Sequence, residues 1–487
     1  MKFLTQLLIL ILLLVLRTSA QEVRNPMFEL HGVWVASVNN IDWPSAKNLS
    51  VNQQKQEFTN LVEMHRKNGI NSLFVQIRPA ADALYQSSYE PWSEFLMGKQ
   101  GVAPNPFYDP LEFMIEETHK RGMEFHAWLN PYRAVFNIKS SSITANHITN
   151  LKPEWFLVYG DKKYFNPALK EVRDYFNNIV IDIVSRYNVD GIHIDDYFYP
   201  YKIAGKEFPD YRFYKASQTT LSLSDWRRSN CDSIIKQLWF TINSLPKRVK
   251  FGVSPFGVWR NIEKDPNGSF TKAGQTNYDD LYANILLWLK KGWVDYCVPQ
   301  LYWERGHALC DYDTLLNWWA KNSFGRQVYV GHGLYKAGTT PGYRDFNELP
   351  NEIINLRKQQ NIQGSVYFSS SNFIANINGW SDSLRLNYYS TPAIIPPMAW
   401  IDSSKPNPPT ITSYPEGGYS FKYSGNTKIK GIAIFTGQSK ASSVCKKIIF
   451  DPKEEYNLDD YYTNSLTKIF IASLSVTNNL SDLVEVK

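Results

Sequence analysis

The chain has 487 residues and a formal net charge of +6 at neutral pH. This length exceeds one ordinary hydrophobic core, so we expect one large domain and a smaller one. The charge excess is mild and forms no long basic run, which makes nucleic acid a poor candidate partner. Trp, Tyr and Phe make up 15% of the chain, a content typical of carbohydrate-binding surfaces as well as of ordinary cores.

Residues 1–20 have the pattern of a secretory signal peptide. Lys2 supplies the positive start, residues 7–16 form an apolar run, and residues 18–20 are small. Cleavage removes Lys2 and Arg17 and lowers the formal charge from +6 to +4. No later segment approaches the roughly 20 apolar residues of a membrane helix. We therefore expect an exported protein, periplasmic or extracellular, with no stable membrane span after cleavage; retention of the segment as an anchor is the alternative.

The four cysteines, Cys231, Cys297, Cys310 and Cys445, are scattered and form no C-x-x-C pair. This spacing supports neither a zinc ribbon nor a redox motif. We expect no metal and no cofactor. A Cys297–Cys310 disulfide and buried free thiols both remain compatible with the sequence.

Eight strand-like segments follow one another, most of them succeeded by a helical pattern. The expected strands cover residues 31–38, 71–77, 124–130, 191–194, 249–255, 294–303, 327–331 and 365–369. The expected helices cover residues 51–68, 110–121, 168–187, 223–245 and 279–291. Such alternation implies parallel pairing with right-handed crossovers, so residues 21–390 are predicted to form a (β/α)8 TIM barrel. An open doubly wound sheet is the rival, but no G-x-G-x-x-G follows the first strand.

The composition changes after residue 390. Six prolines between residues 391 and 410 indicate a stiff linker. Short β-type runs then cover residues 419–423, 429–436, 446–450 and 469–476. Residues 411–487 are therefore predicted to form a small β-sandwich, a fibronectin-III-like accessory domain.

Polar or aromatic side chains follow five successive strands of the predicted barrel, where the carboxyl ends of the strands meet over one pocket. The candidate substrate-binding residues are Arg78, Asp82, Asn130, Tyr132, Arg133, His193, Tyr197, Trp259, Gln300 and Tyr302. Aromatic side chains beside acids suit a flat ligand such as a sugar.

Three acids are the candidate catalytic residues: Asp195, Asp196 and Glu304. Strand alternation places His193 and Asp195 on one face and Asp196 on the other. Glycoside hydrolysis requires two carboxyl groups, one to attack or to activate water and one to protonate the leaving oxygen. We take Asp195 as the nucleophile and Glu304 as the acid/base, while Asp196 orients Asp195, binds a sugar hydroxyl or is itself the principal catalyst.

Each candidate also has a structural interpretation. Asp195 could cap a turn or pair with Arg78, and Arg78 could instead form an ion pair with Asp82. Glu304 precedes Arg305, which would lower the pKa of the Glu304 carboxyl if the two were close. His193 could be a core histidine.

Six segments, in order along residues 28–380, resemble the glycosyl-hydrolase-like family ten proteins of bacterial envelopes. They cover residues 31–45 (HGVWVASVNNIDWPS), 74–93, 108–133, 190–200 (DGIHIDDYFYP), 251–261 and 298–304. The resemblance implies a (β/α)8 barrel and a hydrolase that cleaves a polysaccharide outside the cytoplasm. Bacterial cell-wall (peptidoglycan) glycan is one substrate it suggests; a dietary or host polysaccharide stays open.

Two other functions remain as alternatives. One is a non-catalytic glycan-binding protein, which would keep the aromatic side chains and tolerate loss of the acids. The other is a metal-dependent polysaccharide deacetylase using His193, Asp195 and Asp196, although the chain has no H-x-H or H-E-x-x-H pattern. If the substrate carries N-acetyl groups, its own acetamido group could replace the nucleophile.

Overall fold

A computed structural model describes residues 25–486 except 197, 414–418, 451–454 and 457–466. The predicted signal peptide lies outside the described residues. Within the described part of the chain, no helix is both long enough and apolar enough to cross a membrane.

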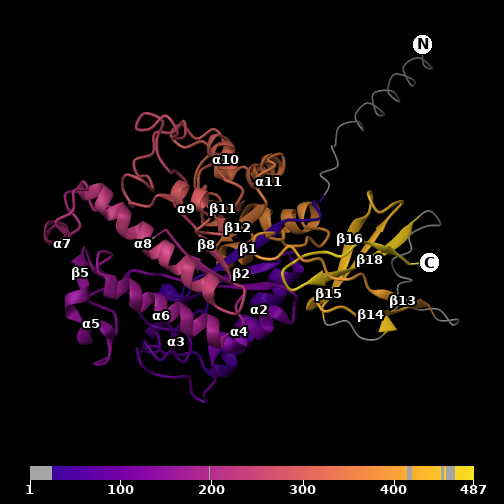
Figure 1. Ribbon diagram of the computed structural model, residues 1–487, viewed down its shortest axis with the longest axis horizontal. Coiled ribbons are helices and arrows are strands. Elements are labelled where there is room, and N and C mark those ends of the chain that lie inside the picture. Colours follow the sequence, from indigo (N-terminus) through magenta and orange to yellow (C-terminus); the bar gives the residue numbers. More distant parts are fainter. Residues whose placement is uncertain (1–24, 197, 414–418, 451–454, 457–466, 487) are drawn as a thin grey trace, which may run out of the picture.

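The large domain is a nearly closed parallel barrel, which confirms the predicted (β/α)8 fold (Figure 1). Its nine strands lie in the order β10–β9–β8–β7–β3–β2–β1–β12–β11. They are β1 (Leu30–Val35), β2 (Ser72–Arg78), β3 (Glu124–Leu129), β7 (Gly191–Ile194), β8 (Lys250–Val253), β9 (Tyr296–Cys297), β10 (Gln327–Val328), β11 (Val330–Gly333) and β12 (Gly364–Phe368). Only Tyr329 separates β10 from β11, so the two share one position and the nine strands fill the eight positions of the barrel.

Side chains that alternate along the strands divide the core in two. Trp34, Phe74, Tyr296 and Tyr329 belong to a cluster that fills the barrel interior, where rings from different strands meet. The intervening side chains belong to a second, larger cluster that includes the helices outside the barrel. Gly252 is required by this interior, because a Cβ atom there would lie 2.1 Å from Cζ of Tyr296.

Helices surround the barrel and begin at recognisable caps. Ser50 and Gln53 form a capping box at the start of α2 (Val51–Lys67), and Asp109 caps α4 (Pro110–His119), which has proline at its first position. The remaining longer helices are α6 (Lys170–Arg186), α8 (Leu223–Ser244), α9 (Ile285–Lys291), α10 (Tyr312–Lys321) and α11 (Glu348–Arg357). Shorter helices are α3 (Glu94–Met97), α5 (Ile148–Leu151), α7 (Tyr211–Ala216), α12 (Ser370–Ala375) and α13 (Trp380–Ser383).

Two predicted elements have other bounds in the structure, and one sheet was not predicted. The strand expected over residues 294–303 is only two residues long, because Pro299 has no N–H for the ladder. The helix expected from residue 279 begins at Ile285, where Asn284 caps it. An antiparallel sheet of β4 (Arg133–Val135), β5 (Phe156–Tyr159) and β6 (Lys162–Phe165), which was not expected, lies between β3 and α6.

The C-terminal segment forms two small antiparallel sheets, as the predicted sandwich requires. One contains β13 (Thr410–Ser413), β14 (Tyr419–Lys422) and β17 (Glu455–Tyr456); the other contains β15 (Ile429–Gly437), β16 (Val444–Phe450), β18 (Lys468–Ser475) and β19 (Val484–Glu485). In β15, Ile432 and Ile434 cluster with Ile411 of the first sheet, while Ala433 and Phe435 cluster with Ile394, which precedes this domain. Both faces of β15 are thus covered, which explains its unbroken apolar run.

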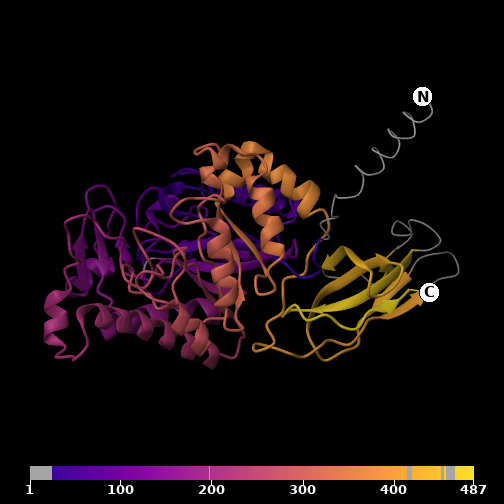
Figure 2. The same ribbon diagram turned by 90° about the horizontal axis from the view of Figure 1, so that it is seen from above.

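The C-terminal domain packs against the end of the barrel where the strands begin (Figure 2). Asn478 donates a 2.8 Å hydrogen bond to Glu124, the first residue of β3. Phe450 of β16 lies against Gly122, just before the same strand. The domain therefore lies at the opposite end of the barrel from the carboxyl ends of the strands.

Candidate active site

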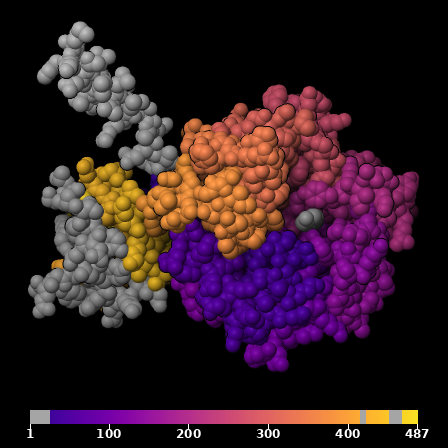
Figure 3. Space-filling model, turned by 180° about the vertical axis from the view of Figure 1, so that it is seen from behind, coloured from indigo at the N-terminus to yellow at the C-terminus, as the bar shows by residue number. Residues whose placement is uncertain are grey.

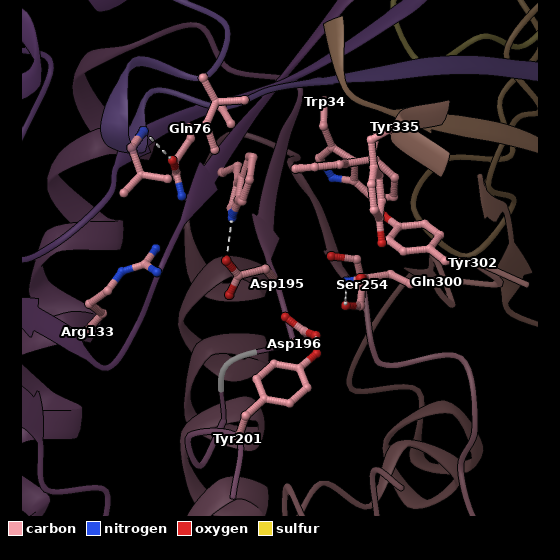
Figure 4. Close-up of a pocket in the computed structure, with 15 residues that line it drawn as sticks. Trp34, Gln76, Arg133, Asp195, Asp196, Tyr201, Ser254, Gln300, Tyr302 and Tyr335 are labelled. Atoms are coloured by element: carbon pink, nitrogen blue, oxygen red, sulfur yellow. Dashed lines mark hydrogen bonds between the residues drawn. The ribbon is translucent and has the colours of Figure 1, made fainter. Parts of the chain in front are cut away.

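A cavity of about 230 Å³ opens at the carboxyl ends of the barrel strands (Figure 4). Its lining comes from β1, β2, β3 and β12 and from the segments that follow β1, β3, β7, β8, β9 and β11. The lining residues are Trp34, Ala36, Val38, Ile41, Gln76, Trp128, Arg133, Asp195, Asp196, Tyr201, Ser254, Gln300, Tyr302, Tyr335 and Phe368. Of the predicted site residues, the structure brings together Arg133, Asp195, Asp196, Gln300 and Tyr302.

Asp195 and Asp196 are the two carboxylates in this described lining. Asp195 directly follows β7, and its Oδ2 accepts a 3.0 Å hydrogen bond from the Trp128 indole N–H. The residue is buried, with 3% of its surface exposed, and it lines the cavity. Asp196 lines the same cavity, although alternation predicted the opposite face. Because β7 ends at Ile194, the side chains that follow it need not alternate between the two faces of the strand. Both acid side chains therefore reach the same cavity.

Asp196 has the properties of a proton donor. Burial raises the pKa of its carboxyl to about 6, although the hydroxyl of Tyr201 and the positive charge of Arg133 both favour the ionised form. Tyr201 donates its hydrogen to Asp196 Oδ2. A carboxyl with this pKa is protonated in a substantial fraction of molecules in mildly acidic solution, as general acid catalysis requires.

Arg133 and an aromatic group lie on opposite sides of the acids. The Arg133 guanidinium points into the cavity, and its Nε donates a 3.0 Å hydrogen bond to the Pro79 carbonyl (Figure 4). Across the cavity, Tyr302 and Tyr335 meet edge to face at 5.9 Å, with Phe368 next to both. Aromatic faces opposite a charged side suit a sugar, which presents apolar ring faces and polar edges.

His193 lies beneath the cavity and does not line it. Its Nε2 accepts a 3.2 Å hydrogen bond from the Trp34 indole N–H and lies 3.0 Å from Ser254 Oγ. Because an indole N–H can only donate, Nε2 must be unprotonated, and Nδ1 donates to Tyr296 Oη. Burial and the neighbouring His126 hold the pKa of His193 well below its usual range. His193 is thus a neutral support for Trp34 and Ser254, which do line the cavity.

Arg78 and Asp82 lie outside the lining and do not pair with each other. Arg78 is fully buried and forms a two-pronged ion pair with Glu90, at 2.7 and 2.5 Å. Asp82 accepts a 3.1 Å hydrogen bond from the Ala80 backbone N–H, and burial raises the pKa of its carboxyl to about 7. The suggested Arg78–Asp82 and Arg78–Asp195 ion pairs are therefore wrong, because the Arg78 guanidinium pairs with Glu90.

Three other predicted residues are also absent from the cavity lining. Asn130 Oδ1 accepts hydrogen bonds from the backbone N–H groups of Tyr132 and Arg133, which shapes the turn that presents Arg133. Tyr132 is buried, with 1% of its surface exposed. Trp259 stacks on Trp318 at 5.9 Å. Tyr197 lies outside the described residues.

Glu304 is not brought to the two aspartates. Its Oε1 accepts a 3.1 Å hydrogen bond from Thr340, and its side chain lies against Gly342. The neighbouring Arg305 pairs with Glu348 at 3.1 Å rather than with Glu304. Tyr302 therefore lines the cavity, whereas Glu304 is not among the described lining residues. The proposed pair of Asp195 and Glu304 does not meet in one described pocket.

Two further observations on the described residues concern thiol and metal chemistry. All four cysteines are buried free thiols. Among the residues that the structure describes, no group of three or more His, Cys, Asp and Glu side chains is arranged to hold a metal ion.

Comparison with known proteins assigns the chain to a family. The profile described as "Glycosyl hydrolase-like 10" matches residues 29–342, which is more than half of the chain and includes every barrel strand except β12. The chain belongs to the glycosyl hydrolase-like 10 family.

Curated relatives of this glycosyl hydrolase-like 10 protein agree with that assignment. "Glycosyl hydrolase YngK" of Bacillus subtilis (strain 168) is 45% identical over 395 residues, covering 80% of this chain and 77% of the relative. "Glycosyl hydrolase DigH" of Escherichia coli (strain K12) is 35% identical over 366 residues, covering 72% and 82%. Among solved structures, the catalytic domain of β-amylase from Paenibacillus polymyxa superposes with a TM-score of 0.50 at 10% identity, covering 75% and 99%. This last likeness concerns the fold alone.

Several residues that line the cavity of this family member were not predicted from the sequence. Trp34 and Ala36, Gln76, Trp128 and Ser254 all lie inside the barrel at its open end. The signal was present in alternation: Trp128 is two residues after His126, and Gln76 two after Phe74, on the interior face of each strand. Phe368 is the last residue of β12. Tyr201 lies in the segment after β7 and Tyr335 in the segment after β11, so only the folded loops bring these two side chains to the cavity.

Proposed function

We propose that this protein is a secreted glycoside hydrolase that cleaves glycosidic bonds in an N-acetylated polysaccharide, with bacterial cell-wall glycan strands as the substrate. The observation that carries the proposal is the pairing of two adjacent carboxylates, Asp195 and Asp196, in a cavity walled by aromatic side chains. Membership of a glycosyl hydrolase-like family supports the reaction class. The signal-peptide pattern of residues 1–20 supports export.

In this mechanism Asp196 is the general acid. Its raised pKa keeps a proton available for the leaving glycosidic oxygen in mildly acidic solution. Tyr201 holds one of its oxygens in place. The positive charge of Arg133 lowers the pKa of Asp196 and so opposes part of the effect of burial.

Asp195 takes the second role. In TIM-barrel enzymes the catalytic residues usually come from the ends of several different strands. Here both come from the end of β7, while Glu304 is held by Thr340 outside the cavity. This arrangement favours a substrate whose acetamido oxygen attacks the anomeric carbon, with Asp195, fixed by Trp128, orienting the acetamido group. The leaving oxygen takes the Asp196 proton, and water then opens the cyclic intermediate and returns a proton to Asp196.

The aromatic group supplies binding. Tyr302, Tyr335 and Phe368 present apolar surface for a sugar ring, while Gln300, Gln76 and Arg133 present polar atoms for its hydroxyl groups. Gln300 is itself fixed by a 3.0 Å hydrogen bond to the Ser254 carbonyl.

The test compares an N-acetylglucosamine oligosaccharide, the same oligosaccharide after chemical deacetylation, and peptide-free cell-wall strands. Product analysis should find cleavage of the acetylated substrates and a loss of cleavage on deacetylation. Equal cleavage of both oligosaccharides would refute the role of the acetamido group. Binding of all substrates without product release would instead favour the glycan-binding alternative, and release of acetate without chain cleavage would favour a deacetylase.

A further inference from the structure

Gln76 of β2 lies in the wall of the hydrolytic cavity, the cavity at the carboxyl ends of the barrel strands, and the residue is fully buried. In the parallel pairing of β2 with β3 its Cα partner is Trp128, and Trp128 donates a hydrogen bond to Asp195. Gln76 is therefore one strand away from the residue that holds Asp195. Figure 3 shows the face of the molecule where the indigo, magenta and orange segments that supply this lining come together.

The orientation of the Gln76 amide is fixed by its neighbours. Its Oε1 accepts a 2.9 Å hydrogen bond from the backbone N–H of Val38. A backbone N–H can only donate, so the amide atom that faces it must be the oxygen and the other must be the nitrogen. Ser37 Oγ donates a 2.8 Å hydrogen bond to the Gln76 backbone carbonyl, which holds the same part of β2. The Nε2 group consequently points toward the cavity (Figure 4).

This Nε2 group is a buried donor that has no hydrogen-bond partner among the described residues. Gln300, the other glutamine of the described lining, differs in this respect, because its Nε2 donates a 3.0 Å hydrogen bond to the Ser254 carbonyl. A buried donor without an acceptor is unfavourable, and a site built around one selects ligands that supply the acceptor. The Gln76 amide thus calls for an oxygen atom of the ligand.

The neighbouring acid indicates which oxygen this is. A carboxylate accepts several hydrogen bonds, so Asp195 has acceptor capacity beyond its bond from Trp128. A donor and an acceptor in one wall match a secondary amide, whose C=O accepts and whose N–H donates. In a trans amide these two groups point in opposite directions. An acetamido group placed between Gln76 and Asp195 therefore satisfies both side chains.

We propose that Gln76 is a specificity-determining residue whose Nε2 donates to the acetamido carbonyl oxygen of the bound sugar, while Asp195 accepts from the acetamido N–H. This inference rests on the proposed function and adds to it the residue that selects the N-acetyl group. The carbonyl takes one of the two hydrogens on Nε2, so the other remains for a sugar hydroxyl. A sugar with a free amine offers no carbonyl and leaves the Gln76 donor unpaired.

The test measures binding without turnover, in the full chain without residues 1–20 and with Asp196→Asn. The probes are an N-acetylglucosamine oligosaccharide and its N-thioacetyl counterpart, in which sulfur, a weak acceptor, replaces only the carbonyl oxygen atoms. Isothermal titration calorimetry should show that the acetyl probe binds about tenfold more tightly, the equivalent of one hydrogen bond. Adding Gln76→Met should abolish this preference, because methionine keeps the side-chain length but has no donor.

The matched control is Gln237→Met, which removes an amide from α8, outside the cavity lining, and should keep the preference. Circular dichroism checks that the variants fold, and Gln76→Leu, which also lacks a donor, takes the place of Gln76→Met if the latter does not fold.

Loss of the acetyl preference in Gln76→Met alone supports the proposal. Three results overturn it: no binding or no preference in the Asp196→Asn protein, a preference that survives Gln76→Met, or equal weakening of both probes by Gln76→Met. Equal weakening would mean that Gln76 only maintains the cavity wall. Cleavage is assayed separately with native Asp196. If no glycan is cleaved while the preference depends on Gln76, the proposed hydrolysis fails and the recognition by Gln76 stands.

Discussion

Tyr201 donates a hydrogen bond to Asp196, and both residues line the hydrolytic cavity. The contact has a measurable consequence, because a donor to a carboxylate stabilises its ionised form. Tyr201 therefore holds the pKa of Asp196 lower than burial alone would set it, at about 6.

The first prediction concerns the pH dependence of hydrolysis. Asp196 must be protonated to act as the acid, so kcat/KM should fall as the pH rises through about 6. Tyr201→Phe removes the donor that favours the ionised form, and the alkaline limb should move upward by about 0.5–1 pH unit. A pH–rate profile of each protein measures this. A limb that stays in place, or moves downward, would show that Asp196 is not the titrating acid.

The second prediction separates the acids. Asp195→Asn and Asp196→Asn should each lower kcat/KM by at least about 100-fold, the usual contribution of a general acid or comparable group. Glu304→Gln should leave kcat/KM near the native value, because Glu304 bonds to Thr340 outside the cavity. Steady-state kinetics on an N-acetylated oligosaccharide provides the measurement. A large loss in Glu304→Gln would restore the pairing of Asp195 and Glu304 expected from the sequence.

The third prediction concerns sugar binding by the aromatic group. Tyr302→Ala and Tyr335→Ala should each raise KM about 3- to 10-fold, because each removes apolar surface that faces the cavity. Tyr211→Ala is the matched control, since Tyr211 is 53% exposed and does not line the cavity. If the control and the two cavity variants have the same KM, these rings do not bind substrate.

The fourth prediction concerns stability. Burial raises the pKa of Asp82 from 3.8 to about 7, so its contribution to stability is fully present below about pH 4 and is lost as the pH rises through 7. Asp82→Asn removes this titration and should become the more stable protein above pH 7, by up to about 4 kcal/mol. Urea unfolding at pH 5 and pH 8 measures the effect, with the exposed Asp161→Asn as control. A difference between native and Asp82→Asn that does not change with pH would refute it.

Much of the fold could be predicted because local patterns and global topology agree. Apolar runs such as residues 191–194 end on acids, helices such as α2 begin at capping boxes, and their alternation allows few arrangements besides a parallel barrel. Elements that depend on long-range pairing were missed. The β4–β5–β6 sheet consists of short strands that pair only with one another, and the length of β9 was overestimated because Pro299 interrupts its ladder.

The residues of the candidate site were likewise predicted only in part. Asp195, Gln300 and Tyr302 line the cavity as alternation predicted, although each lies just beyond the end of its strand. The positions of Asp196 and Glu304 do not follow from alternation, since each lies where a loop leaves the sheet and the side-chain direction depends on contacts with Tyr201 or Thr340. Arg78 illustrates the same limit: its partner Glu90 lies twelve residues away along an irregular segment.

By itself, the sequence determined the barrel, the small β-sandwich that follows it and the strand that carries the two aspartates, because hydrophobic periodicity and turn chemistry act over a few residues. Only the tertiary structure decided which acids share a cavity, which cation each acid pairs with, and that the C-terminal domain covers the base of the barrel. Those outcomes depend on loops and domain contacts whose geometry is set by packing between residues far apart in the chain.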